Sequence, residues 1–345
     1  MLLASSLGLF PNAQPVKATT KIVPDNYPTI QEAINHANTG DTVFVRSGTY
    51  HENVVVNKSL LVVGESKFST IIDGRLSGYV VTVTAENVTL CGFRVTNSSY
   101  SCAGIFLNST RHSKIADNTV TNSFYGVNFD CASYNSLFDC EIEGSLHSGV
   151  AFKFDAGIKS EFENQVYRNN IHNNQIGIYF DGIAYNNTIS CNDLVNNSIG
   201  IDFFFWGDGY NTIIQNNIIA TQHCALTFDN GENKWDNGYP LGGNYWSDYA
   251  GADTDGDGIG DIPHVIDSAN VDNYPLMRPW KFGDINYDGS VDGLDLIFTA
   301  DALGSMPSDP KWNPRADLKE DGRINVLDLI LVAVNLSKAK VKLTH

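Results

Sequence analysis

A short strand that opens with glycine recurs through the middle of the sequence. Each copy continues with an apolar residue, a variable residue and a second apolar residue, and successive copies start 22 to 28 residues apart. The copies start at Gly104, Gly126, Gly149, Gly177 and Gly200, with a variant at Cys224. Self-similarity at such a period is typical of solenoids, because one coil cannot bury its inner face and needs a neighbour above and below it.

A second pattern, apolar-x-x-Asn-x-apolar, keeps step with the first. We interpret Cys91 and Cys140 as replacements for the asparagine in two of the copies. An asparagine repeated at one bend tolerates the left-handed backbone of that bend, and its amide group can join its neighbours in a ladder. We therefore predict that four asparagines stack in a single column: Asn118, Asn169, Asn192 and Asn216.

Two motifs in phase predict a mainly β chain that folds as a right-handed parallel β-helix with three short strands in each coil. Neighbouring coils then lie about 4.8 Å apart, and alternation along each strand directs residues such as Val127 and Phe129 inward. An open solenoid end exposes unpaired backbone groups. Residues 28–38 carry helix-start residues and one apolar face, so we predict that they form a helical N-terminal cap.

Composition and charge favour an exported protein. The net charge of −17 argues against nucleic acid or an anionic membrane as a partner. Residues 1–18 contain an apolar stretch and the small-x-small triplet Val16-Lys17-Ala18, which we interpret as the remnant of a secretory signal. Several Asn-x-Ser/Thr triplets fit a glycoprotein, and no apolar run is long enough to span a membrane. We expect a secreted or cell-surface location.

An acidic run near residue 255 predicts a calcium site in the segment that closes the β-helix. Carboxylates alternate along it and glycines occupy the tight turns, which suits a hard cation that needs several oxygens within one short loop. The predicted ligands of residues 253–261 are Asp253, Asp255, Asp257, the backbone carbonyl of Ile259, and Asp261.

The C-terminal region contains two further calcium-loop patterns, 33 residues apart, and each is followed by a helix. The first loop has its glycine at Gly289, and its predicted ligands are Asp284, Asn286, Asp288, Ser290, Asp292 and Asp295. The second loop has its glycine at Gly322, and its predicted ligands are Asp317, Asp321, Arg323, Asn325 and Asp328. Calcium is therefore the expected cofactor.

These segments resemble known families. The stretch from Tyr27-Pro-Thr-Ile to Ser47-Gly-Thr-Tyr is similar to the N-terminal cap of pectin-lyase-like β-helix proteins. The stretch Gly242-Gly-Asn-Tyr-Trp-Ser-Asp-Tyr, with the acidic run and Asp272-Asn-Tyr-Pro after it, resembles the closing segment of NosD-like proteins of archaeal surfaces. Residues 282–338, with Asp at the twelfth position of each loop and one helix per loop, resemble a type I dockerin module.

These resemblances imply a β-helix over residues 19–280 and a calcium-folded module over residues 281–338 that binds a cohesin-like protein. Residues 339–345 then form a basic tail. The NosD family is named for copper, but the three Met and scattered His of this chain do not predict a copper site.

Two departures from the dockerin pattern concern calcium and partner binding. Lys319 stands where the second loop needs an oxygen ligand, so we predict weaker calcium binding there. The positions that dockerins use for cohesin recognition read Gly293-Leu294 and Val326-Leu327 instead of the hydroxylated pair.

Outward residues of the glycine-led strands are expected to stack in two rows from coil to coil, and they define a candidate carbohydrate site. Aromatic rings stack on the apolar faces of sugars, while carboxylates bind hydroxyls or act as acid and base. The candidate sugar-binding residues are Phe106, Tyr179, Phe204 and Trp206. The candidate catalytic residues are Asp130, Lys153, Asp155, Asp181 and Asp202.

Three functional hypotheses follow. The first is a surface β-helix protein that binds polysaccharide or surface glycans, or serves a structural or adhesive role, and is attached through the calcium module. The second is a polysaccharide lyase or glycoside hydrolase that acts on an acidic polysaccharide. The third is a subunit of a surface layer or filament. Turnover of a polysaccharide distinguishes the second hypothesis, and regular assemblies of the purified protein distinguish the third.

Overall fold

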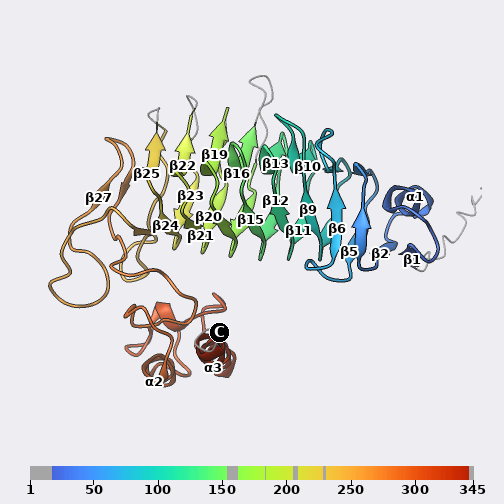
Figure 1. Cartoon of the computed structure of the whole chain (residues 1–345). Helices are drawn as coiled ribbons and strands as arrows, with labels where there is room; N and C mark the ends of the chain where they lie inside the picture. The colour runs from blue at the N-terminus through green and yellow to red at the C-terminus, as the bar shows by residue number, and fades with distance from the viewer. Residues whose placement is uncertain (1–17, 154–161, 183, 205–208, 228–230, 342–345) are drawn as a thin grey trace, which may run out of the picture.

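The structure is a computed structural model that describes residues 18–153, 162–182, 184–204, 209–227 and 231–341. Most of the predicted signal segment, the candidate residues Asp155 and Trp206, and the end of the basic tail lie outside these described residues. The described chain forms an elongated solenoid with a small helical unit beside its C-terminal half (Figure 1).

Three parallel sheets run along the solenoid, and the fold class predicted from the repeat is confirmed. Sheet 1 contains β1 (Thr20–Val23), β2 (Thr42–Val45), β5 (Leu61–Gly64), β8 (Thr89–Cys91), β11 (Lys114–Ala116), β14 (Ser136–Phe138), β17 (Gln165–Tyr167), β20 (Thr188–Ser190) and β23 (Thr212–Ile214). Sheet 2 contains the glycine-led strands: β4 (Val54–Val56), β7 (Val81–Val83), β10 (Ala103–Asn108), β13 (Tyr125–Asp130), β16 (Ser148–Lys153), β19 (Ile176–Asp181), β22 (Ile199–Phe203) and β25 (His223–Thr227). Sheet 3 contains β3 (Gly48–Tyr50), β6 (Thr70–Asp73), β9 (Arg94–Thr96), β12 (Thr119–Thr121), β15 (Glu141–Glu143), β18 (Asn170–His172), β21 (Asp193–Val195), β24 (Asn217–Ile219) and β26 (Tyr245–Trp246).

The predicted asparagine column exists and extends by one residue. Asn192 illustrates the bonding: its Oδ1 accepts from the backbone N–H and the side-chain amide of Asn169, at 3.0 Å each, and its Nδ2 donates to the carbonyl of Val166 at 2.8 Å. Cys140 occupies the column as predicted, because its Sγ lies 3.5 Å from the backbone nitrogen of Asn118. The column continues through Asn216 to Asn244.

The interpretation of Cys91 was wrong. In the sheet register Cys91 pairs with Ala116, so Phe93, and not Cys91, lies beside Asn118. The backbone nitrogen of Phe93 donates to Asn118 Oδ1 at 3.0 Å, which ends the column on that side. In this coil the pattern starts at Leu90, two residues later than the Val88 start that places Cys91 in the column. Apolar residues are frequent enough here to fit either alignment.

Two further asparagine columns were not predicted. One runs through five consecutive coils and joins buried side chains in the same bonding pattern: Asn135, Asn164, Asn187, Asn211 and Asn233. The other joins Asn174 to Asn197. The first column has a sequence signal, since each asparagine stands two residues before the apolar residue at the centre of a sheet 1 strand or its continuation.

The core is packed by stacked rings. Phe129, Phe152, Phe180 and Phe203 are fully buried on sheet 2, and their ring centroids lie 4.9, 4.8 and 4.3 Å apart in succession. The glycine that opens each strand is required by the close approach of neighbouring coils. A Cβ at Gly126 would lie 2.4 Å from the carbonyl oxygen of Gly149, a distance at which the backbone would have to move.

Both solenoid ends are capped. Helix α1 (Ile30–His36) covers the N-terminal end as predicted, with Thr29 as its N-cap and Ile30, Ala33 and Ile34 buried. The C-terminal end is closed by residues that complete the asparagine columns. Asn270 Oδ1 accepts from the backbone of Asn233, and Asp272 Oδ2 accepts from the backbone of Asn244. The hairpin β27 (His264–Val265) and β28 (Val271–Asp272) carries these acceptors.

The C-terminal unit contains α2 (Gly293–Asp301), the short 3-10 helix η1 (Pro314–Ala316) and α3 (Val326–Val341). Its small core comprises Ile285, Ala302, Ala316, Ile324 and Val332. Figure 1 shows α2 and α3 below the C-terminal half of the solenoid. None of the helices in the described ranges is long and apolar enough to cross a bilayer.

Replacing Asn192 with alanine is expected to lower the free energy of unfolding by about 2–4 kcal/mol. The reason is that the buried backbone N–H of Asn169 loses its acceptor. Asn170→Ala is the matched control, because this asparagine is exposed in the adjacent strand β18, and a change within about 0.5 kcal/mol is expected. Urea unfolding of both variants measures the difference, and equal midpoints would contradict a stabilising column.

Candidate functional site

Two rows of outward side chains stack along sheet 2, as predicted. The strand register places Phe106, Asn128, Ala151, Tyr179 and Asp202 in row 1. It places Asn108, Asp130, Lys153 and Asp181 in row 2. The candidate residues within these two rows are therefore neighbours, although they are spread over about a hundred positions of the sequence.

Row 1 is a packed layer. Phe106 and Tyr179 are each 7% exposed, and the ring of Phe106 stacks on Tyr79 with a centroid distance of 4.1 Å. A sugar ring therefore has no free aromatic face at these two positions. Phe204 differs, since 52% of it is exposed.

Row 2 carries the charged groups. The ammonium group of Lys153 lies 3.8 Å from an oxygen of Asp181 and 4.3 Å from the ring centroid of Tyr125. Asp130 precedes Lys153 in the row, one coil away. Because Lys153 lies over the ring of Tyr125, which packs in the same cluster as Phe106 and Tyr179, it connects row 2 to that aromatic layer.

His147 belongs to this cluster and was not predicted. Its ring lies among those of Phe124, Tyr125 and Tyr179, with centroid distances of 5.3, 5.1 and 4.7 Å. Burial, reinforced by the nearby Lys153 charge, lowers the pKa of His147, so the imidazole is neutral near pH 7. His147 stands just before strand β16, outside the repeated pattern, so the repeat gives no signal for it.

Asp202 has the most unusual environment on this face. It is 6% exposed, and its Oδ1 has no hydrogen-bond partner among the described residues. Burial raises the pKa of Asp202 to about 6. Asp181 lies on the neighbouring strand and faces Lys153 instead. Two carboxyl groups in such different environments are what an acid and base pair requires.

The closing segment brings three of its predicted calcium ligands together. One carboxylate oxygen from each of Asp253, Asp255 and Asp257 lies within 4.8 Å of the others. Asp261 is not part of this group, because its Oδ2 accepts from the backbone N–H and the hydroxyl of Thr254, at 2.8 and 2.7 Å. A cluster of carboxylate oxygens suits calcium, which prefers hard oxygen ligands.

The first loop of the C-terminal unit concentrates buried negative charge. Asp284 is 3% exposed, and its Oδ1 has no hydrogen-bond partner in the described part of the chain. Burial and the charge of Asp295 raise the pKa of Asp284 to about 6. The other predicted ligands of this loop lie between Asp284 and Asp295 in the sequence: Asn286, Asp288, Ser290 and Asp292. Asp292 is also the N-cap of α2.

The second loop contains a positively charged side chain, Lys319, between two of its predicted ligands. The ammonium group of Lys319 lies 3.3 Å from Asp321 Oδ2. The side-chain amide of Asn325 donates to the carbonyl of Arg323 at 3.4 Å, and that carbonyl is a predicted ligand. Both oxygens of Asp328 accept backbone N–H groups, at 3.1 and 2.9 Å, from Lys319 and Asn325. Asp317 Oδ2 accepts from the backbone of Gly322 at 2.9 Å.

Two family models match the chain. The model described as "Periplasmic copper-binding protein (NosD)" matches residues 34–251. The model described as "Dockerin type I domain" matches residues 282–337. The predicted resemblances to both families are thereby confirmed.

A cell surface glycoprotein of Methanothermus fervidus is 36% identical over 98 residues, which are 28% of this chain and 16% of that protein. The chain therefore covers less than a fifth of this relative. Among solved structures, pectin methylesterase PemA from Erwinia chrysanthemi has a TM-score of 0.41 and 10% identity, over 59% of this chain and 79% of that one. Pectate lyase Pel9A has a TM-score of 0.42 and 15% identity, over 62% and 61%.

The Asp202→Asn variant is expected to be more stable than the wild type at pH 8, by about 1–3 kcal/mol. The raised pKa means that the folded state holds its proton more tightly than the unfolded state, so ionisation above pH 6 destabilises the fold. The gain must shrink as the pH falls from 8 to 4, because Asp202 is then protonated in the folded protein.

Glu86→Gln is the control for loss of a negative charge, because Glu86 is exposed on the same solenoid. Urea unfolding at both pH values measures the effect. An Asp202→Asn variant that is less stable than the wild type at pH 8 would show that the carboxylate has a stabilising partner.

Proposed function

The chain belongs to the NosD family, and on this premise we propose that it is an exported cell-surface β-helix protein that binds carbohydrate and is attached through a calcium-folded, dockerin-type module. The family model covers residues 34–251, and the dockerin model covers residues 282–337. The partial match to an archaeal cell surface glycoprotein supports the extracellular location.

The copper that the family's name implies does not fit the residues of this chain. Copper sites are built from imidazole, thiolate and thioether ligands. In the described part of the chain, the one group of three or more His, Cys, Asp or Glu residues that brings its ligand atoms together is all carboxylate: Asp253, Asp255 and Asp257. No copper chemistry is therefore included in the proposed function.

The strongest support for calcium binding in the module is the buried Oδ1 of Asp284, which has no hydrogen-bond partner among the described residues. A carboxylate oxygen in this position loses its solvation, and the neighbouring Asp295 repels its charge. A calcium ion bound to Asp284, Asp288 and Asp295 would relieve both effects, because it supplies two positive charges and binds oxygen. Bound calcium would then hold the start of α2 to the loop, so the module folds only when it is loaded.

The surface of the module supports attachment to a protein partner. Each helix exposes several apolar side chains, and these include one pair a turn apart in which close to half of each side chain is accessible: Leu294 and Ile297 on α2, and Leu327 and Ile330 on α3. The two pairs are related by the 33-residue repeat of the loops. Exposed apolar side chains of this kind are typical of interaction sites, and a cohesin-like domain is the expected partner of a dockerin-type module.

A second candidate function, a lyase or hydrolase of acidic polysaccharide, is favoured by Asp202. A carboxyl group with a pKa near 6 can act as a general acid at neutral pH, and Asp181 on the neighbouring strand, 3.8 Å from the ammonium group of Lys153, provides the second carboxyl group. Release of reducing ends or unsaturated uronates from a polysaccharide panel tests this candidate. Turnover that is lost in Asp202→Asn, with the fold retained, would support catalysis, and absence of turnover with every polysaccharide would exclude it.

Calcium titration by calorimetry tests the proposed attachment module. Asp284→Asn is expected to bind one calcium ion fewer than the wild type and to lose the helical circular dichroism of α2. Lys319→Asp is expected to bind calcium more tightly in the second loop, because an oxygen ligand replaces the ammonium group that now pairs with Asp321.

Asp301→Asn is the matched control, since this exposed residue ends α2 outside both loops. It should leave the calcium stoichiometry unchanged. Equal calcium binding by the wild type and Asp284→Asn would contradict calcium-dependent folding of the first loop.

A further inference from the structure

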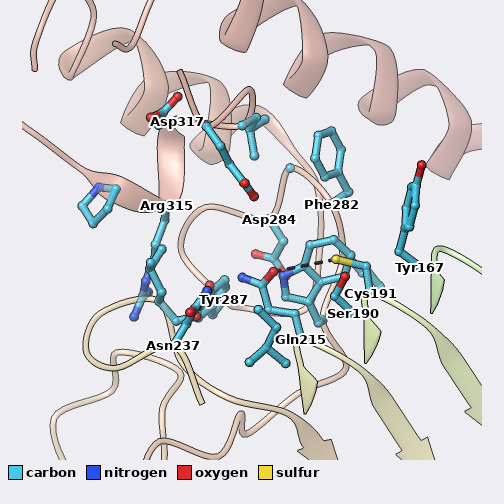
Figure 2. Close-up of a pocket in the computed structure, with 18 of the residues that line it drawn as sticks. Tyr167, Ser190, Cys191, Gln215, Asn237, Phe282, Asp284, Tyr287, Arg315 and Asp317 are labelled. Carbon is cyan, nitrogen blue, oxygen red and sulfur yellow. Dashed lines mark hydrogen bonds between the residues drawn. The ribbon is translucent and has the colours of Figure 1, made fainter. Parts of the chain in front are cut away.

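A cleft of about 700 Å³ separates sheet 1 of the solenoid from the dockerin-type module. Its solenoid wall comes from β17, β20 and β23, and its module wall comes from the linker residues 280–284 and from residues near both calcium loops. Figure 2 shows Tyr167 and Phe282 on one side of this cleft and Arg315 with Asn237 on the other. The volume is in the range of pockets that bind a small molecule, about 300–1,000 Å³.

Hydrogen bonds near the cleft join the linker and the module to the solenoid and its closing segment. The side chain of Asn217 binds both backbone polar groups of Trp280: Oδ1 accepts from N–H at 2.6 Å, and Nδ2 donates to the carbonyl at 3.0 Å. The hydroxyl of Tyr287 donates to the carbonyl of Leu241 at 2.8 Å. Arg315 donates to the carbonyl of Pro240 at 2.6 Å. The module is therefore fixed on the solenoid, and a ligand would meet a preformed site.

The walls combine aromatic rings with uncharged polar groups. Tyr167, Trp280 and Phe282 each expose part of their ring to the cleft, while Ser190 and Gln215 contribute a hydroxyl and an amide from the solenoid wall. Sugar rings have apolar C–H faces that pack on aromatic rings and hydroxyls that need donors and acceptors. A hydrocarbon ligand would leave the polar wall unpaired, so the combination favours a saccharide.

The charges around the cleft select against an acidic sugar. Its two cations are engaged elsewhere: Arg315 lies 4.0 Å from the Tyr287 ring centroid and bonds to backbone carbonyls, and Lys281 donates to the carbonyl of Gly289. Glu320 faces the same space from the module wall, beside the predicted calcium ligands Asp284 and Asp317. A uronate would meet these carboxylates on a chain whose net charge is already −17.

We propose that the cleft between sheet 1 and the dockerin-type module binds a short neutral oligosaccharide, with Tyr167 and Phe282 as the rings that pack on the sugar. This inference rests on the proposed carbohydrate-binding function and gives it a location and a ligand class. The site differs from the two rows on sheet 2, because its residues come from another sheet and from the module. Two parts of the chain build it together, so neither part alone would bind the sugar.

The test measures binding of malto-, manno-, xylo- and chito-tetraose to the full chain in calcium-containing buffer, with tetragalacturonate as the acidic comparator. Calorimetry gives the affinity, and the emission of Trp280 and Trp312 at the cleft reports occupancy. At least one neutral tetrasaccharide is expected to bind. Tyr167→Ala and Phe282→Ala should each weaken its binding by about tenfold or more.

Tyr100→Ala is the matched control and should leave binding unchanged, since Tyr100 is 78% exposed and lies outside the cleft. Ser190→Trp is a second variant that fills the cleft from the solenoid wall without changing the core, and it should abolish binding. Unchanged affinity in both alanine variants and in Ser190→Trp would overturn the proposal. Binding of tetragalacturonate alone, or of no saccharide, would overturn it as well.

Calcium stoichiometry is measured on the same samples. A fully loaded protein that binds no sugar contradicts the cleft and leaves the calcium-folded module standing. A protein that binds no calcium contradicts the module itself. The two failures are therefore distinguishable.

Discussion

The structure depends on side-chain amides that replace the hydrogen bonds missing at the bends of a β-helix. At each bend the chain turns away from its sheet, and the backbone groups there cannot pair within a strand. Buried asparagines accept from the coil before and donate back to it, as Asn192 does with Asn169 and Val166. Because an unpaired buried N–H costs about 1–3 kcal/mol, these columns keep the coils from Phe93 onward in register, and the outward rows follow from that register.

The same constraint explains the closing segment. The backbone N–H of the last asparagine in a column still needs an acceptor. Residues 253–280 provide it, as Asn270 for one column and Asp272 for the other. Asp272 is buried with a pKa raised to about 6, mainly by loss of solvent, and donors from Asn244 and Trp246 offset part of that effect. The closing segment also carries the acidic loop at Asp253, so one short stretch both ends the solenoid and contains the first of the three predicted calcium loops.

The module contacts the closing segment of the solenoid directly and is not joined to it by the linker alone. Tyr287 stands inside the first calcium loop, yet its ring is 8% exposed because it packs on the closing segment, and Gly258 there has no room for a Cβ beside it. Arg315 reaches from the module to Pro240 and Asp257. Loss of calcium from the first loop would therefore also disturb the junction and the cleft beside it.

The sequence by itself determined the coil, the N-terminal cap, the column through Asn169, Asn192 and Asn216, and the stacking of the rows on sheet 2. All of these follow from periodicity, which is local and repeated. Burial of Phe106, Tyr179 and Asp202, the place of His147, and the cleft between sheet 1 and the module were decided only by the tertiary structure. The physical reason is that exposure and pKa depend on which residues from distant coils cover a side chain, and a repeat pattern specifies the stacking of a coil but not what lies over it.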